Sequence, residues 1–326
     1  MHVLVTGANG FVGRALAARL AAAGRLGDRA LTRLSLLDMG FGDAPAREGL
    51  VHRHAGDLAD AAMLDRALAG APLDAVFHLA SIPGGTAEAD YALARRVNLD
   101  ATLGLLERGR AQVLVGGAAP VFIFASSIAV FGPLSAPVTD DTLPRPQMTY
   151  GAQKLAGEIL VDDFSRRGWV DGRSLRLPGV LARPPARTGQ LSAFLSDIIR
   201  ELAAGRPFVS PMSPQARTWA SSLPNVVDNL LHAAVLDVMG QARRRTYTLP
   251  TSCFSMAELV DAIAQVHGAD AVRRVRYEPD AAIEQRFGGF APLHAQAALA
   301  AGFRADDSLV DLVRGALDGI GHPGAG

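Results

Sequence analysis

Short apolar runs and stretches of helical spacing alternate along the first half of the chain. The apolar runs are typical of buried strands and lie at residues 2–6, 34–37, 75–79, 121–124 and 173–177. Apolar residues recur at helical spacing between them, in residues 11–23, 58–69, 87–108 and 150–166. Strands that alternate with helices over short connections predict a doubly wound parallel sheet, so we expect an α/β fold.

The regular alternation of predicted strands and helices ends after about residue 178. The pattern there predicts helices over residues 191–204 and 226–238 and a short strand over residues 246–249. Ser255, with Glu258 three residues later, forms a capping-box pattern that predicts the start of a further helix. The glycine-rich tail after Gly319 is predicted to be disordered.

This change of pattern suggests two domains. We expect residues 1–177, with about 216–250, to form a doubly wound domain of the Rossmann type. Residues 178–215, with 251–326, are expected to form a smaller C-terminal α/β region that binds the substrate.

Composition narrows the class of protein. The 326 residues include 32 basic and 32 acidic ones, and this balance argues against a nucleic-acid partner. Residues 111–139 carry no charge, but glycines, prolines and serines interrupt them, so we expect no membrane span. A single cysteine, the lack of a basic region before the apolar N-terminus and the absence of metal-ligand spacing favour a cytoplasmic protein without a metal.

A cluster of glycines follows the first predicted strand. Gly7 permits a tight turn, Gly10 allows the backbone to approach a pyrophosphate, and Gly13 allows the next helix to pack on the strand. The N-terminus of that helix would point its positive end at the phosphates. With a strand before it and a helix after it, the cluster predicts a dinucleotide site.

Two acidic residues are candidates for the adenosine side of this site. Asp38 ends the second strand, where a carboxylate would bind the ribose hydroxyls and repel a 2′-phosphate, which favours NAD over NADP. Asp57 is a candidate near the adenine, although an aspartate before a helix is equally often a helix cap.

Tyr150 and Lys154 form the candidate catalytic pair. They lie four residues apart on a predicted helix, so their Cβ atoms are about 5–6 Å apart on one face. A free tyrosine has a pKa near 10, and a neighbouring ammonium lowers that pKa and makes the phenol a plausible proton acceptor. Ser126 and Ser127 end the strand before this helix, where doubly wound sheets bind ligands.

These motifs resemble those of the extended short-chain dehydrogenases/reductases, the NAD-dependent epimerase/dehydratase family. The resemblance spans more than half of the chain in the family's order, and it includes the segments at 7–13, 56–58, 76–80, 126–132, 150–154 and 176–178. It implies that Ser127, rather than Ser126, orients the substrate oxygen, that Tyr150 exchanges the proton and that Lys154 also holds the nicotinamide ribose. The cofactor residues it implies are Gly7, Asn9, Gly10, Phe11, Val12, Gly13, Asp38, Asp57, Leu58, Leu79, Ala80, Tyr150 and Lys154.

Within the family, the wording of several segments resembles the D-erythronate dehydrogenase subgroup. These segments lie at 87–90, 96–100, 163–173 and 226–232. The resemblance implies NAD-dependent oxidation of D-erythronate at C2 to 2-oxo-tetronate, and a homodimer through the helices around 88–108 and 150–166. Residues 82–85 depart from the subgroup's usual pattern, which leaves the exact substrate open.

An acid substrate needs a cation for its carboxylate, best a bidentate arginine. Arg217 is the candidate, at the position where the family's sugar-nucleotide members place an arginine for the diphosphate, so it suits either anion. Ser81 and Thr86 are candidates to face the substrate hydroxyls, together with Ser127 and Tyr150. The predicted substrate-binding set is Ser81, Ser127, Tyr150 and Arg217.

Three functions stay open at this point. The first is an NAD-dependent dehydrogenase of a small sugar acid, and the second is a UDP-hexose 4-epimerase with tightly bound NAD. The third is a protein that binds NAD without catalysis, since a fold does not fix a function. The complete set of Ser127, Tyr150 and Lys154 argues against the third.

Overall fold

The structure is a computed structural model that describes residues 1–42, 48–68, 70–132, 134, 136–183, 192–237 and 244–318. The chain divides into two compact units. Unit 1 comprises residues 1–130, 145–176 and 229–247, and unit 2 comprises residues 131–144, 177–228 and 248–326. The tail after Gly319, predicted to be disordered, lies outside the described residues.

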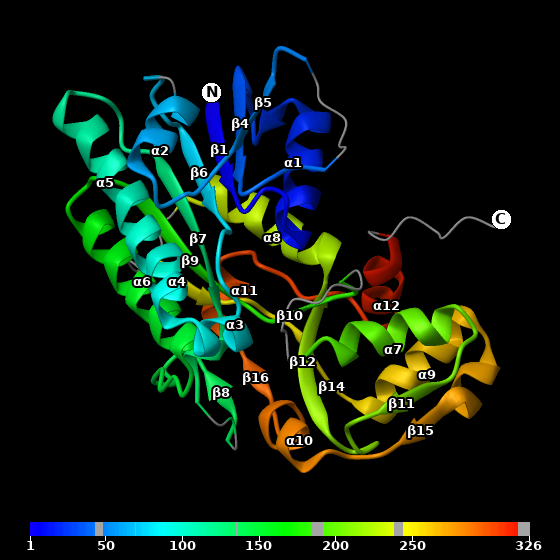
Figure 1. The fold of residues 1–326 in the computed structure, drawn as a ribbon. Coiled ribbons are helices and arrows are strands. Elements are labelled where there is room, and N and C mark those ends of the chain that lie inside the picture. Colours follow the sequence, from blue (N-terminus) through cyan, green and yellow to red (C-terminus); the bar gives the residue numbers. More distant parts are fainter. Residues whose placement is uncertain are drawn as a thin grey trace. The chain divides into compact units, whose positions relative to one another are not determined.

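A seven-stranded parallel sheet forms the centre of unit 1 (Figure 1). Its strands, in spatial order, are β13 (Thr246–Thr248), β9 (Asp171–Leu177), β7 (Val121–Ser127), β6 (Ala75–His78), β1 (His2–Thr6), β4 (Arg33–Asp38) and β5 (Val51–Ala55). The pairings of β1 with β4 and β6, of β4 with β5 and of β6 with β7 are all parallel. The order reverses between β1 and β6, which is the point where doubly wound sheets bind ligands. The predicted α/β fold class is confirmed.

Helices cover both faces of this sheet (Figure 1). One apolar cluster joins strands β1, β4, β6 and β7 to helices on one face, and α1 lies on the other. The helices of that cluster are α2 (Ala61–Leu68), α5 (Ala101–Leu114) and α6 (Thr149–Arg166), and α1 spans Phe11–Ala23. Helix α8 (Leu223–Val235) begins in unit 2 and ends in unit 1.

The segment predicted as one helix over residues 87–108 is instead a series of short helices. It contains α3 (Gly84–Ala89), α4 (Tyr91–Arg95), a π-helical turn η1 (Arg96–Asp100) and the start of α5. Asp90 separates the first two, because its carboxylate accepts a hydrogen bond from the backbone N–H of Leu93 (2.9 Å) and caps α4. Single π-helical turns within helices occur frequently at functional sites.

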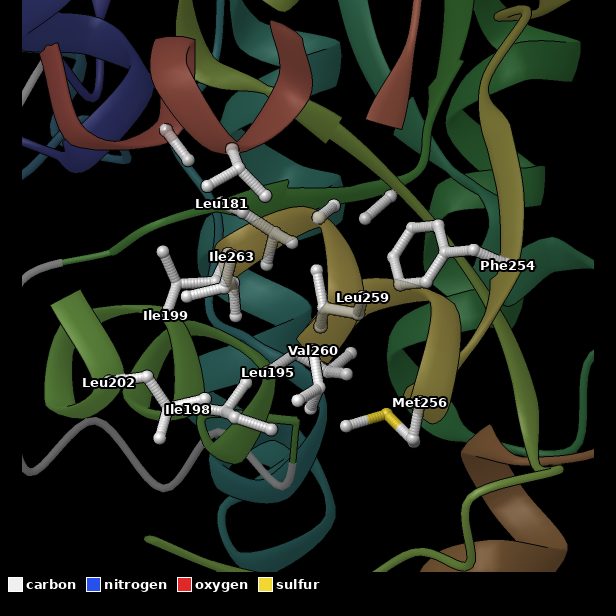
Figure 2. Packing of buried hydrophobic residues seen from close by; sticks show 14 of the residues in the cluster. Leu181, Leu195, Ile198, Ile199, Leu202, Phe254, Met256, Leu259, Val260 and Ile263 are labelled. Carbon is white, nitrogen blue, oxygen red and sulfur yellow. The ribbon is translucent and has the colours of Figure 1, made fainter. Parts of the chain in front are cut away.

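Unit 2 contains a three-stranded mixed sheet, with β12 (Arg217–Ser222) between β10 (Gly179–Leu181) and β14 (Ser252–Ser255). Its apolar core joins α7 (Phe194–Ala203), α9 (Met256–His267) and α12 (Leu309–Asp318). Figure 2 shows this core, where Leu195, Ile198 and Ile199 of α7 lie with Leu259 and Ile263 of α9. The remaining elements are β2 (Arg25–Leu26), β3 (Arg29–Ala30), η2 (Ile128–Val130), β8 (Val138–Thr139), β11 (Phe208–Ser210), η3 (Ala269–Arg274), β15 (Val275–Tyr277), α10 (Ala281–Phe287), β16 (Leu293–His294) and α11 (Gln296–Ala300).

The two units differ from the expected domains at residues 131–144 and 216–228, which belong to unit 2. The physical reason for the second difference is that β12 pairs with β10 and β14 rather than with the large sheet. The predicted capping box is confirmed, since Ser255 and Glu258 each accept a hydrogen bond from the other's backbone N–H. In the described ranges, no helix combines the length and apolar character that a membrane crossing requires.

Candidate active site

The glycine turn after β1 is closely enclosed by backbone. Gly7 has a φ of +67°, and a Cβ placed on it would lie 2.6 Å from the backbone nitrogen of Ala80, in the loop after β6. A Cβ on Gly13 would lie 2.0 Å from the carbonyl oxygen of Gly7. Both positions therefore require glycine, and the turn lies where the strand order of the sheet reverses.

The first turn of α1 suits a phosphate group. Gly10 is the N-cap of this helix and carries no side chain that could cover the helix N-terminus. The positive end of the helix and the backbone N–H groups of its first turn are the ordinary features of an anion site. The arrangement of Gly7, Gly10 and Gly13 thus fits the pyrophosphate of a dinucleotide, with Asn9, Phe11 and Val12 on the same turn.

Asp38, at the end of β4, is tied to this turn. One carboxylate oxygen accepts a hydrogen bond from the N–H of Asn9 (2.8 Å), and the other accepts one from the N–H of Met39 (2.7 Å). The carboxylate therefore supports the glycine turn, which sequence reasoning had not predicted. A carboxylate has about four acceptor sites, so it retains the capacity to bind ribose hydroxyls.

Asp57 has two partners. Its carboxylate accepts a hydrogen bond from the N–H of Ala59 (2.9 Å), and it forms an ion pair with Arg96 (2.7 Å) on the π-helical turn. The hydrogen bond to Ala59 closes the turn before α2, but Asp57 is not the helix cap, because the carboxylate of Asp60 accepts the hydrogen bond from the N–H of Ala62 (2.9 Å) at the start of α2. Contact of Asp57 with adenine stays a prediction. The neighbouring Leu58 is buried.

The loop after β6 contains three predicted site residues, Leu79, Ala80 and Ser81, all partly exposed. Asn98 holds this loop by two hydrogen bonds to the backbone of Ile82, one to the N–H (2.8 Å) and one to the carbonyl (3.1 Å). Asn98 therefore ties the loop after β6 to the π-helical turn. Thr86, also predicted to face the substrate, lies within α3.

Adjacent serines at the end of β7 have different surroundings. Ser126 is buried and donates a hydrogen bond to Glu158 on α6. Ser127 is partly exposed, and its hydroxyl oxygen accepts a hydrogen bond from the N–H of Ala129 (3.1 Å). Successive side chains of a strand point to opposite faces, so Ser127 does not share the direction of Ser126. This geometry fits Ser127 as the serine that is open to a ligand.

Tyr150 lies in the first turn of α6, and a glycine sets its position. A Cβ on Gly151 would lie 2.1 Å from the carbonyl oxygen of Ala129, in the short helix that follows Ser127. The start of α6 therefore packs directly on this segment and brings Tyr150 close to Ser127 in the fold. Sequence reasoning missed Gly151, although its place next to Tyr150 was a usable signal.

Lys154 is buried one turn further along α6. Its Nζ lies 5.7 Å from the ring centroid of Tyr150 and 4.8 Å from that of Phe124 on β7. Burial lowers the pKa of Lys154 from 10.5 to about 7, and the charge of Glu158 opposes this effect. With a pKa near 7, the side chain of Lys154 is partly protonated at neutral pH, and its cationic form favours the phenolate of Tyr150.

His78, at the end of β6, is fully buried in a hydrogen-bonded network. Its Nδ1 lies 2.7 Å from the hydroxyl of Thr6, and its Nε2 lies 2.8 Å from the hydroxyl of Thr102. Thr102 donates its own proton to the carbonyl of Asn98 (2.8 Å), so Nε2 is the nitrogen that donates to Thr102. Burial, and secondarily the charge of Lys154, lowers the pKa of His78 to about 3. His78 is therefore a neutral packing residue.

Arg217 begins β12 in unit 2. Its guanidinium donates to the carbonyl of Cys253 (3.1 Å) and pairs with Glu258 (3.3 Å), the same carboxylate that completes the capping box of α9. The side chain is about half exposed, at 45%. A guanidinium has five N–H donors, so these partners leave capacity for an anion. Among the residues that the structure describes, no three histidine, cysteine or acidic side chains gather as metal ligands would.

The fold and the glycine turn define a class of protein, and comparison with known families identifies it. Residues 3–222 match the family described as "NAD dependent epimerase/dehydratase family". The chain belongs to this family, as its motifs indicated.

Individual relatives extend the similarity over almost the whole chain. The chain is 39% identical to the "D-erythronate dehydrogenase" of Cupriavidus necator over 98% of its own length and 99% of the relative's. It is 33% identical to the "D-erythronate dehydrogenase" of Haemophilus influenzae, over 96% and 98%. A solved structure described as a nucleoside-diphosphate-sugar epimerase from Agrobacterium tumefaciens is 35% identical and superposes with a TM-score of 0.90, over 98% of this chain and 94% of that one.

Proposed function

We propose that the chain is an NAD-dependent dehydrogenase that oxidises a small 2-hydroxy sugar acid, with D-erythronate as the first candidate. The observation that supports this substrate most directly is the near full-length similarity to two relatives named D-erythronate dehydrogenase. The geometry is compatible with the reaction type, because the buried Lys154 lies 5.7 Å from the ring of Tyr150 and the start of α6 packs on the segment that follows Ser127.

Each residue has a role that follows from its position. When bound, NAD would accept the hydride from C2 of the acid. Ser127 would hold the C2 hydroxyl oxygen, and the phenolate oxygen of Tyr150 would take the hydroxyl proton as the carbonyl forms. The ammonium of Lys154 favours the phenolate and lies on the same helix face, where it could also hold the nicotinamide ribose.

The cofactor preference follows from Asp38. A carboxylate that ends β4 beside the glycine turn would accept hydrogen bonds from ribose hydroxyls and repel a 2′-phosphate. We therefore propose NAD rather than NADP. Binding of NAD and NADP to the same preparation, measured by isothermal titration calorimetry, tests this preference, and equal affinity for both would contradict it.

Arg217 is our proposed clamp for the substrate carboxylate, since a guanidinium binds a carboxylate through two parallel hydrogen bonds. Ser81 is proposed to contact the substrate from the loop after β6. Both roles are compatible with the partial exposure of these side chains.

A second function has one specific observation in its favour. The structure from Agrobacterium tumefaciens, described as an epimerase, shares 35% of its residues with this chain. A nucleotide-sugar epimerase would keep its NAD bound through each turnover, and Arg217 would then hold a diphosphate.

One experiment separates the two functions. The purified protein is incubated with NAD and D-erythronate, with other four- and five-carbon aldonates, and with UDP-hexoses, while NADH formation and sugar interconversion are followed. NADH formed with D-erythronate supports the dehydrogenase. Hexose interconversion without net NADH formation would replace it with the epimerase.

We further propose a homodimer. Large apolar side chains are exposed on three neighbouring helices of unit 1, namely Tyr91 on α4, Leu103 on α5 and Ile159 on α6. A second copy of the chain that packs on these helices would cover them. Sedimentation equilibrium tests the proposal, and a mass of one chain at micromolar concentration would contradict it.

A further inference from the structure

Glu158 is a buried charged residue on α6 for which the reaction above has no use. Its carboxylate accepts a hydrogen bond from the hydroxyl of Ser126. It accepts two more from the guanidinium of Arg176, one from Nε (2.9 Å) and one from Nη2 (2.8 Å). The side chains of Glu158 and Arg176 are only 5% and 13% exposed. Three elements, α6, β7 and β9, thus contribute to one buried ion pair.

Stability alone does not account for this ion pair. Replacing a buried pair with apolar residues of similar volume is often neutral or stabilising, because the charges lose their hydration. A bidentate ion pair beside the candidate site therefore indicates a role in that site rather than in stability. The neighbouring residue that this carboxylate can serve is Lys154, which lies four residues earlier on the same helix.

The three residues Tyr150, Lys154 and Glu158 are spaced by four along α6, so they form one row on its surface. The lysine lies between a phenol and a carboxylate, and the aromatic ring of Phe124 lies 4.8 Å from its Nζ. Ser126 and Arg176 hold the carboxylate from two strands of the sheet, which fixes the last member of the row.

We propose that Glu158, held by Arg176 and Ser126, is a positioning residue that fixes a negative charge one helical turn from Lys154 and thereby favours the cationic form of Lys154 beside Tyr150. This inference rests on the proposed function, since it assigns a role toward the Tyr150–Lys154 pair. Glu158 acts through Lys154 and does not touch the reacting atoms. The adjacent serines of β7 then have separate tasks, Ser126 toward the carboxylate and Ser127 toward the substrate.

The charged and titratable groups around Lys154 agree with this role. The ring of Tyr150 lies beside it, Glu158 follows one turn later on α6 with Arg176 of β9 as its ion-pair partner, and His78 of β6 is close enough for the charge of Lys154 to affect its pKa. His78 is neutral above acidic pH because its pKa is about 3. Burial is the larger effect and lowers the pKa of Lys154 to about 7, and the charge of Glu158 acts in the opposite direction.

The test measures the ionisation of Tyr150 directly and does not require turnover. Tyrosinate absorbance is titrated for the full chain and for its Tyr150→Phe counterpart, and the difference gives Tyr150 alone among the four tyrosines. In Glu158→Gln, the lysine loses its anion and the phenol loses its cationic neighbour. The ionised fraction of Tyr150 at a given pH should then fall about tenfold, the effect of one pH unit.

A second variant covers the case in which Glu158→Gln does not fold, because that change leaves Arg176 buried without its anion. The double variant Glu158→Gln/Arg176→Met removes both charges and should show the same shift of Tyr150 with native circular dichroism. Asp171→Asn is the matched control, since Asp171 pairs with Arg173 and Arg245 at the other end of β9. This control should lower the melting temperature and leave the titration of Tyr150 unchanged.

The outcomes separate this inference from the proposed function. A folded double variant whose Tyr150 titrates as in the wild type would overturn the inference, even if the wild type oxidises D-erythronate. A shifted titration in a protein that oxidises no acid would support the positioning role and reject the dehydrogenase. Where both hold, the acid limb of kcat/KM should move to higher pH together with the titration.

Discussion

The two units of this protein bury different kinds of side chain. Unit 1 buries Lys154 and Glu158 on α6 and His78 on β6. Hydrogen bonds hold Glu158 and His78, and Lys154 lies beside two aromatic rings. The core of unit 2 shown in Figure 2 is apolar, and its candidate for substrate contact, Arg217, is half exposed at the start of a strand. Under the proposed function, proton transfer would use desolvated charges that the fold fixes, whereas binding of the acid would use a cation at the surface of unit 2.

The largest expected effect comes from unit 1. Tyr150→Phe removes the proton acceptor and should lower kcat by about 10²–10⁴-fold, the usual contribution of a general base. NAD affinity should change little, because the glycine turn is untouched. Steady-state kinetics and calorimetry measure the two quantities. Tyr277→Phe in unit 2 is the matched control, and near wild-type turnover by Tyr150→Phe would reject the mechanism.

The next effect should come from unit 2 and should have the opposite kinetic signature. Arg217→Met removes the proposed carboxylate clamp and should raise KM for the acid roughly 10- to 100-fold, since hydrogen bonds to charged groups contribute about 1.5–3 kcal/mol. The kcat should change much less. Arg206→Met is the control, because Arg206 is an exposed arginine of unit 2 that pairs with Glu201. An unchanged KM would exclude Arg217 from the acid site.

A third prediction concerns acid stability in unit 1. The pKa of His78 is lowered to about 3, so the unfolded chain binds its proton at a higher pH than the native protein does. The stability contributed by neutral His78 is therefore complete above pH 6.5 and is lost as the pH falls from there toward 3. This loss amounts to about 2 kcal/mol between pH 7 and pH 5.

The measurement is urea unfolding of the wild type and of His78→Gln at both pH values. The variant should be less stable at pH 7, and the gap to the wild type should shrink by about 2 kcal/mol at pH 5. A gap that is independent of pH would show that His78 does not enter the native state as a neutral side chain.

The smallest expected effect separates the two roles of Glu258 in unit 2. Ser255→Ala removes the cap of α9 and should cost about 1 kcal/mol of unfolding free energy. Glu258→Gln retains the capping box, because glutamine serves at this position, and removes only the charge beside Arg217. Its unfolding free energy should change by less than about 1 kcal/mol, as exposed ion pairs contribute little. Equal losses in both variants would contradict this division.

Much of unit 1 could be predicted from the sequence because its strands are short apolar runs. Within the large sheet the exception is β5, whose residues Val51–Ala55 include two histidines and an arginine at an edge of the sheet. This strand forms by parallel pairing with β4, and its sequence has no apolar pattern that would predict it. The break of the predicted helix at Asp90 likewise could not be predicted from the spacing of apolar residues, since a helix cap depends on a single hydrogen bond.

The candidate site was predictable where motif and spacing coincide, as for Tyr150 and Lys154. It was less so where the decisive contact comes from a distant segment. Glu158 lies at helical spacing from Lys154, which was a usable signal, but its partner Arg176 follows only from the neighbouring position of β7 and β9 in the sheet. The prediction that Ser127, rather than Ser126, contacts the substrate rested on the resemblance. The structure is compatible with it, because successive side chains of β7 point to opposite faces of the sheet.

The hydrogen bond of Asp38 to Asn9, together with its proposed contact with the ribose of NAD, has a consequence for coenzyme engineering. Its carboxylate accepts a hydrogen bond from the N–H of Asn9. The residue that would discriminate against a 2′-phosphate therefore also stabilises the glycine turn. A redesign toward NADP that changes Asp38 alone would exchange one recognition element and loosen another. Such a redesign needs at least two substitutions, because one of them must supply a replacement acceptor for the N–H of Asn9.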